Sequence, residues 1–291
     1  MSFFSPRSSF VRSASKSGSK PMTDEQIMRA APSAFAAEKH QSRSERYAYI
    51  PTSEVIDGLR NNGFVPMFAK QGNSRVPGKA DFTKHLIRFR HEGQKAGMQK
   101  VGDTYPEVIL VNSHDGTSAY KIMAGLFRLV CLNGMVVSDR EFANVSIPHK
   151  GNVTDLVIEG SYTVLSESRK ALEAADAWAG VTLSRPEQMA MAEAAHTVRF
   201  GDGEGDTETA IKPEQLLSVR RYDDHGSDLW RTANIIQENV IRGGLSAWGR
   251  NANGQRRRTT TREVNGIDAD VKMNKALWLL SERMAQIKAA A

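Results

Sequence analysis

The chain has 291 residues, of which 40% are hydrophobic and 25% are charged, and its formal net charge is +6. This composition is that of a globular protein long enough to bury a core, in one large domain or two smaller ones. The single cysteine, Cys131, excludes an intramolecular disulfide and a cysteine-based zinc cluster, which fits a reducing compartment. The sequence has no apolar run long enough for a transmembrane helix, and residues 1–20 lack the apolar core of a secretory signal. We therefore expect a cytoplasmic protein with no membrane partner.

The positive charge is concentrated in three segments. Residues 1–20 and 84–100 each carry a net charge of +4, and residues 241–265 carry +5. The rest of the chain is therefore net negative. This segregation indicates a polyanionic partner, and ordinary solvated surfaces are the alternative explanation.

The N-terminal part of the chain contains one region of expected disorder and one short helix. Residues 1–22 should form a disordered basic arm, because they are rich in serine and poor in branched apolar residues. Thr23 and Asp24 then begin a short capped helix, which Pro32 ends or bends.

A second helix is predicted over residues 53–61. Ser53 is its expected N-cap, and Asn62-Gly63 is its expected stop. Strand patterns flank this helix and dominate the chain from about residue 47 to 165, so residues 23–200 are predicted to form an α+β domain with a mostly antiparallel sheet.

The segment "KHLIRFR" shows a clear strand alternation. It places Ile87 and Phe89 on the same face as His85, while Arg88 and Arg90 lie on the other face with Leu86. Ile87 and Phe89 should face the core. The two arginines should project together, roughly 7 Å apart given the rise of a strand.

The segment "VNSHDGTSAYKIMAGLFRLVCLNGMVV" is interpreted as strands joined by turns. Asp115-Gly116 is a hairpin signal between the strands 108–111 and 120–123, and Asn133-Gly134 marks another turn after a buried run over 127–132.

This pattern also decides how the one cysteine is interpreted. Cys131 lies among apolar residues, where a thiol behaves as a small hydrophobe, whereas a catalytic cysteine should be partly exposed beside a base. His114 falls in a polar turn with no evident orienting group. We therefore favour a buried cysteine over a nucleophile.

The C-terminal part is predicted to be helical. Ser184 caps a helix with Pro186 and Glu187 behind it, and residues 201–212 form an acidic glycine-rich loop. Residues 213–291 should contain two helices around a "DDHGSD" turn and a last helix, together packed on the sheet. The last helix carries an apolar seam too short for a coiled coil, so it should pack on its own domain, with oligomer contacts as the alternative.

Four motifs together resemble a known family. They are "KHLIRFR", "FRLVCLNGM", "EAAHTVRFGD" and "DLWRTANIIQENVIRGGL". In content and order they are similar to a plasmid- and phage-encoded family of unknown function whose members are often labelled "phage/plasmid-like protein". The resemblance implies residence on a mobile genetic element and carries over no catalytic residue. A role near DNA-maintenance genes is implied by association alone.

The leading functional hypothesis is non-enzymatic binding of nucleic acid, most specifically of single-stranded DNA. Phosphate neutralisation needs Lys and Arg, and base stacking needs aromatic faces beside them. The Arg-rich segment "SAWGRNANGQRRRTTTR", taken as a loop, supplies both. The candidate residues are Arg88, Arg90, Lys95, Trp248, Arg250, Arg256, Arg257, Arg258 and Arg262. Single-strand annealing, which is often performed by homo-oligomeric rings, is the most specific version of this hypothesis.

Two alternatives belong to other functional classes. A metal-dependent nuclease could use Asp223, Asp224, His225 and Asp228, although acids before a helix are also typical of an N-cap region. An interaction protein acting on a host defence system is the other. The sequence contains no nucleotide-binding loop and no hydrolase or protease signature, and it predicts no cofactor.

Overall fold

The computed structural model describes most of the chain, in segments separated by gaps. The described residues are 20–42, 49–74, 76–94, 97–98, 103–128, 133–136, 145–201, 210–250 and 254–290. Most of the predicted N-terminal arm and of the acidic loop lies outside these residues, as do Lys95 and Cys131. The interpretation of Cys131 as a buried residue therefore stays a prediction.

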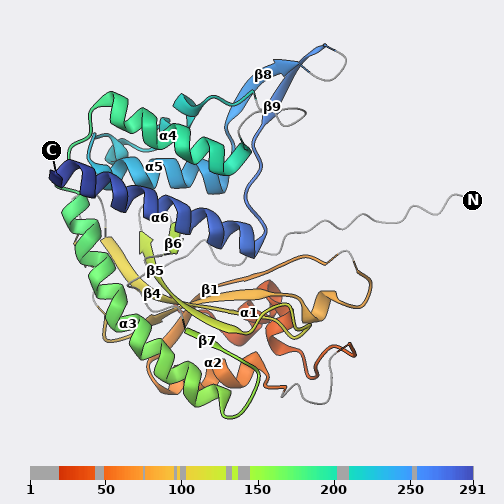
Figure 1. Cartoon of the computed structure of the whole chain (residues 1–291). Coiled ribbons are helices and arrows are strands. Elements are labelled where there is room, and N and C mark those ends of the chain that lie inside the picture. The colour runs from red at the N-terminus through yellow and green to blue at the C-terminus, as the bar shows by residue number, and fades with distance from the viewer. Residues whose placement is uncertain are drawn as a thin grey trace, which may run out of the picture.

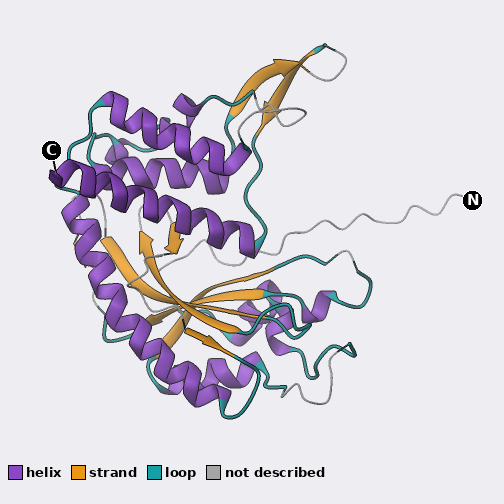
Figure 2. Ribbon diagram, in the orientation of Figure 1, coloured by secondary structure: helices purple, strands orange, loops and turns teal. Residues whose placement is uncertain are grey.

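An antiparallel sheet, with seven strands among the described residues, forms the centre of the molecule (Figures 1 and 2). Its strand order is β1-β2-β4-β5-β6, with β3 paired to β4 and β7 paired to β5. The strands are β1 (Phe64–Gln71), β2 (His85–His91), β3 (Gly97–Met98), β4 (Asp103–Asn112), β5 (Tyr120–Arg128), β6 (Asn133–Val136) and β7 (Val145–Ile147). A separate pair, β8 (Ser246–Arg250) and β9 (Arg256–Thr260), forms a two-stranded sheet.

Helices cover this sheet and build the C-terminal half, which confirms the predicted α+β class. The α-helices are α1 (Asp24–Ala30), α2 (Thr52–Asn61), α3 (Val153–Trp178), α4 (Arg185–Phe200), α5 (Leu229–Arg242) and α6 (Ile267–Ala290). Short 3-10 segments are η1 (Pro32–Phe35), η2 (Ala80–Phe82), η4 (Pro213–Leu217) and η5 (Tyr222–Asp224). Helices α4, α5 and α6 pack on one another as a second layer (Figure 1).

The two faces of the sheet are covered by different helices. Ile87 and Phe89 belong to the main core, with α1, α2 and α3 on that side, as the alternation predicted. On the opposite face Leu86 joins a smaller cluster that includes Ile267 and Val271 at the start of α6. The central strands are consequently buried on both sides.

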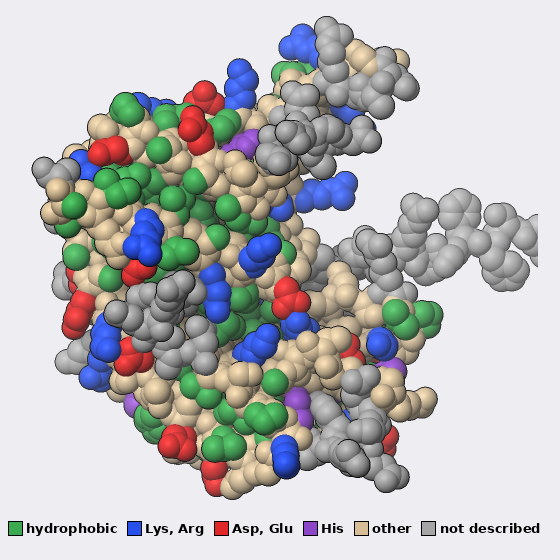
Figure 3. All heavy atoms as spheres, viewed as in Figure 1, with side chains coloured by type: hydrophobic (Ala, Val, Ile, Leu, Met, Phe, Trp, Pro, Cys, Tyr) green, Lys and Arg blue, Asp and Glu red, His purple; other side chains and the backbone are tan. Residues whose placement is uncertain are grey.

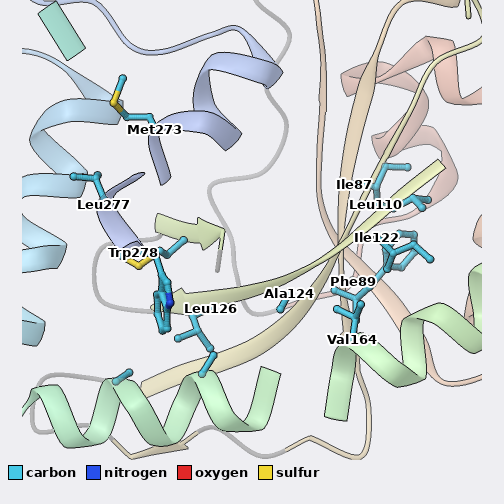
Figure 4. Packing of buried hydrophobic residues seen from close by; sticks show 14 of the residues in the cluster. Ile87, Phe89, Leu110, Ile122, Ala124, Leu126, Val164, Met273, Leu277 and Trp278 are labelled. Carbon is cyan, nitrogen blue, oxygen red and sulfur yellow. The ribbon is translucent and has the colours of Figure 1, made fainter. Parts of the chain in front are cut away.

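Tryptophan side chains join the sheet layer to the C-terminal helices. Trp178 ends the long helix α3, and its ring centroid lies 4.5 Å from that of Trp278 on α6 and 6.4 Å from that of Trp230 on α5. Trp278 also lies close to Leu126 of β5 (Figure 4). All of these side chains are buried, so one continuous core runs through both layers.

Several local predictions are confirmed. Thr23 and Ser184 both form capping boxes, and Gly63, Gly116 and Gly201 have positive φ angles at the predicted stops and turn. Each of these signals depends only on neighbouring residues.

Other boundaries were predicted wrongly. The strand pattern was expected to continue to residue 165, yet α3 already begins at Val153, because Asn152 caps it and its buried residues recur every three to four positions. Asn133-Gly134 lies within β6, not in a turn, and Ser53 does not cap α2, whose N-cap is Pro51. The helix expected before the "DDHGSD" turn is only the 3-10 segment η4.

The tryptophan contact predicts a large effect of one substitution on stability. Trp278→Ala should lower the free energy of unfolding by about 3–5 kcal/mol, because it opens a cavity between the two layers. Leu279→Ala, at a neighbouring side chain that is 47% exposed, should change it by less than about 0.5 kcal/mol. Urea unfolding followed by circular dichroism measures both. Equal effects would contradict the assignment of Trp278 as the joint between the layers.

Candidate functional site

The Arg-rich segment, predicted as a loop, forms an antiparallel hairpin that projects from the body of the protein (Figure 1). In its register Trp248 pairs with Arg258, and Arg250 pairs with Arg256. Signals for a hairpin were present, because the threonines favour a strand and Asn253-Gly254 is a turn dipeptide. The charge of the segment had dominated the interpretation.

One face of the hairpin base is fixed to the body. Ala247 packs against the main core, and a Cβ atom added to Gly249 would lie 2.8 Å from the Cβ atom of Ala210. The side-chain amide of Gln215 donates to the backbone oxygen of Ser246 at 3.0 Å. The hairpin is thus held at its base and is not an unattached loop.

The other face of the hairpin carries an aromatic ring among arginines. Because side chains alternate along a strand, Trp248 and Arg258 share a face with Arg256. Trp248 is 60% exposed, and the guanidinium carbon of Arg256 lies 4.8 Å from its ring centroid. All five residues of β9 are exposed, and Figure 3 shows basic side chains on the projecting hairpin and at its foot.

The remaining candidates of this segment are placed around that face. Arg257 lies on the opposite face of β9 and is exposed. Arg262 is exposed just after the hairpin, and its backbone oxygen accepts a hydrogen bond from Arg199 at 3.0 Å. Arg250 lies at the end of β8, and its side chain is outside the described part of the structure.

Arg88 and Arg90 do not form the open basic face that the strand pattern suggested. They lie on the predicted side of β2, but their side chains are only 10% and 11% exposed. Both contact the carboxylate of Glu107, which is buried on β4. The sequence did not indicate this partner, because it comes from another strand.

The "DDHGSD" turn is built from arginine–carboxylate pairs. Asp224 is buried and accepts hydrogen bonds from Arg128 at 2.6 Å and from Arg221 at 2.9 Å. Arg221 continues to Glu238 on α5 at 2.7 Å, and Arg242 reaches the same carboxylate at 2.7 Å. This network ties the end of β5 to the C-terminal helices.

The other members of the turn have separate roles. Asp228 is the N-cap of α5, accepting from the backbone of Arg231 at 2.9 Å, which confirms the capping interpretation. Asp223 and His225 are exposed. Among the described residues, no group of three or more His, Cys, Asp or Glu side chains could hold a metal ion. The nuclease alternative is therefore left without a set of ligands.

A buried polar network was missed by the sequence analysis. His114 was expected in a polar turn, but it is fully buried and lies beside Thr52 and His85. The hydroxyl of Thr52 is 2.9 Å from Nε2 of His85 and 3.1 Å from Nε2 of His114, and it accepts from the amide of Asn112 at 3.0 Å. Nδ1 of His85 is in turn 2.9 Å from the hydroxyl of Ser33.

Hydrogen-bond valence keeps these histidines neutral. The Thr52 hydroxyl has one proton to donate and two lone pairs, one of which Asn112 occupies. One histidine must accept the hydroxyl proton and the other must donate to the remaining lone pair. Burial lowers the pKa of His85 to about 3 and that of His114 to about 4, and nearby histidines lower both further. The network anchors the N-terminal segment, because Ser33 belongs to η1 and the backbone N–H of His40 donates to the oxygen of His114.

The fold and its projecting hairpin define an α+β protein with a basic two-stranded arm. A family model described as "Domain of unknown function (DUF932)" matches residues 39–278. The chain is 48% identical over 265 residues to the UPF0380 proteins YafZ and YfjQ of Escherichia coli (strain K12), in alignments that cover 91% of this chain and 92% of each relative. The chain therefore belongs to the DUF932 family, which confirms the resemblance found in its motifs. No solved structure matches it.

The described part of the chain contains no helix with both the length and the apolar character needed to cross a bilayer.

The buried histidines predict how stability depends on pH. Above the ordinary histidine pKa of about 6.5 both folded and unfolded chains keep them neutral, so their contribution is fully present. Between about pH 6.5 and 4 the unfolded chain takes up protons that the folded chain does not, and each histidine should lower the free energy of unfolding by about 1.4 kcal/mol per pH unit.

Urea unfolding between pH 7.5 and 5.5 tests this dependence. His114→Gln keeps a polar group near the position of Nε2 but does not titrate, so the slope should fall by about the contribution of one histidine. An unchanged slope would show that His114 is not held neutral in the folded protein.

Proposed function

We propose that this protein binds nucleic acid without catalysis, with the β8–β9 hairpin as its principal contact and single-stranded DNA as its preferred partner. We further infer a cytoplasmic role in the DNA metabolism of a mobile genetic element, such as strand annealing. The proposal rests chiefly on one observation, the exposed ring of Trp248 set among Arg256 and Arg258 on a hairpin anchored to the fold.

The chemistry of this face suits an unpaired strand. Guanidinium groups neutralise backbone phosphates, and an exposed indole can stack on a base of any identity once that base is unpaired. Arg256 lies over the Trp248 ring, so a base on the opposite side would complete a guanidinium–indole–base stack. In a duplex the bases are already stacked on one another, which removes this gain.

The anchoring of the hairpin supports the same conclusion. Its inner face is packed at Ala247 and Gly249, so the arginines and the indole are presented from a fixed position. Less conformational entropy is then lost on binding than with an unattached loop. The surrounding charge also favours a polyanion, since residues 241–265 carry a net charge of +5.

Charge reversal on the hairpin should weaken binding of every sequence. The variant Arg256→Glu/Arg258→Glu should lower affinity broadly and flatten the plot of log K against log salt, because fewer counterions are released. Fluorescence anisotropy of labelled oligonucleotides across a salt series measures both quantities. Arg185→Glu/Arg283→Glu makes the same change in net charge at exposed positions near the far end of the molecule and should have little effect (Figure 1).

Removal of the indole should affect the two forms of DNA differently. Trp248→Ala should weaken single-strand binding by about 1–3 kcal/mol and change duplex binding much less, because only unpaired bases can stack on the ring. Tyr222→Ala removes another exposed aromatic side chain, which is 89% exposed outside the hairpin, and serves as the control. Equal losses for single and double strands would refute stacking. Cleavage of the oligonucleotide on addition of Mg²⁺ would refute the non-enzymatic proposal.

A further inference from the structure

The guanidinium of Arg88 is held edge-on between two aromatic rings on the α6 side of the sheet. Its central carbon lies 4.6 Å from the ring centroid of Phe68 on β1 and 4.6 Å from that of Phe127 on β5. Cation–π contacts of this kind occupy the two flat faces of a guanidinium and leave its nitrogen-bearing edge to hold polar partners.

That edge is only partly satisfied by the protein. Nη1 of Arg88 lies 3.6 Å from Oε2 of Glu107, which is well beyond the distance of a charge-assisted hydrogen bond. Arg90 makes the close contact with the same carboxylate, at 2.8 Å from Oε1. Nε of Arg88 has no hydrogen-bond partner among the described residues. A side chain that is 90% buried is thus left with one long ionic contact.

The charges around Arg88 do not balance. Arg88 and Arg90 share Glu107, which leaves this cluster with one positive charge in excess. Asp270 of α6 also acts on Arg88, but its carboxylate accepts from Lys70 at 3.1 Å, so these two charges compensate each other. An unneutralised cation in a site of low dielectric is costly, and a bound anion would remove that cost.

We propose that Arg88, supported by Arg90, is the binding site for one phosphate group, supplied by the phosphodiester backbone of the bound nucleic acid. A phosphodiester carries a single negative charge, which matches the single excess charge of the cluster. Its two free oxygens match the fork of a guanidinium edge. The 10% of the Arg88 side chain that is exposed gives access from solvent.

The nature of the polymer rests on the proposed function, whereas the presence of the anion site does not. A purely structural arginine would make the opposite prediction, since its replacement would alter stability but no response to phosphate. The two roles are therefore separated by a binding measurement on the full-length protein with a small anion.

The experiment compares the shift in Tm produced by inorganic pyrophosphate with that produced by chloride and by acetate at equal ionic strength. Wild-type protein should be stabilised most by pyrophosphate, and Arg88→Met should lose that shift. Arg88→Lys keeps the charge but not the planar fork, so it should bind pyrophosphate about tenfold more weakly even if the methionine variant does not fold. Lys84→Met is the matched control, because Lys84 is a nearby cation that already pairs with Asp268 at 2.6 Å.

Binding of a single-stranded oligonucleotide forms the second arm. Arg88→Lys should lower affinity and Arg88→Met should also reduce the salt slope by about one phosphate contact, while Trp248→Ala should leave the pyrophosphate shift intact. The same shift in wild type and both Arg88 variants, or no shift in wild type, would overturn the site. A shift with acetate but not with pyrophosphate would overturn it in favour of a carboxylate partner. A pyrophosphate shift that depends on Arg88, without any binding of DNA, would uphold the site and reject the proposed function.

Discussion

The contact of Trp178 with Trp278 is the interaction on which the arrangement of the two layers depends. Helix α3 begins against the sheet and ends at Trp178, where the ring meets α6 at a centroid distance of 4.5 Å. Because Leu126 of β5 packs at the same point, the sheet and the C-terminal helices share one core. The remaining contact, across the other face of the sheet, is small and partly ionic, through Lys70 with Asp270 and Lys84 with Asp268. The position of the hairpin relative to the sheet therefore follows from the tryptophan joint.

The arginines of this protein fall into two physical classes. Those of the sheet and of the "DDHGSD" turn are mostly buried and paired, as Arg128 is with Asp224, and breaking such a pair leaves an uncompensated charge in the core. Those of β9 are exposed and meet solvent. Only the exposed class can follow a long polyanion. Arg88 stands between the two classes, since it is buried like the first but incompletely paired.

The buried network around Thr52 is best understood as an anchor for the N-terminal segment. Its histidines approach one another within a fully buried site, and their low pKa values result from that burial, which by itself would be compatible with catalysis. However, hydrogen bonds within the network occupy both lone pairs and the proton of the Thr52 hydroxyl. A saturated hydroxyl has no capacity left for a substrate. The network instead makes attachment of the N-terminal segment sensitive to acid.

The sequence by itself determined the features that depend on neighbouring residues. The alternation in "KHLIRFR" assigned the faces of β2, the capping boxes placed α1 and α4, and Asp115-Gly116 marked the hairpin, because side-chain period and turn conformation are local properties. Only the tertiary structure decided which charges are available. Arg90 meets a glutamate 17 residues away, and Arg128 meets Asp224 at a separation of 96 residues. No local pattern reports such pairs, since they form only when distant strands and helices are brought together. For the same reason the hairpin, whose inner face is fixed by a separate segment, became a candidate site only in the folded chain.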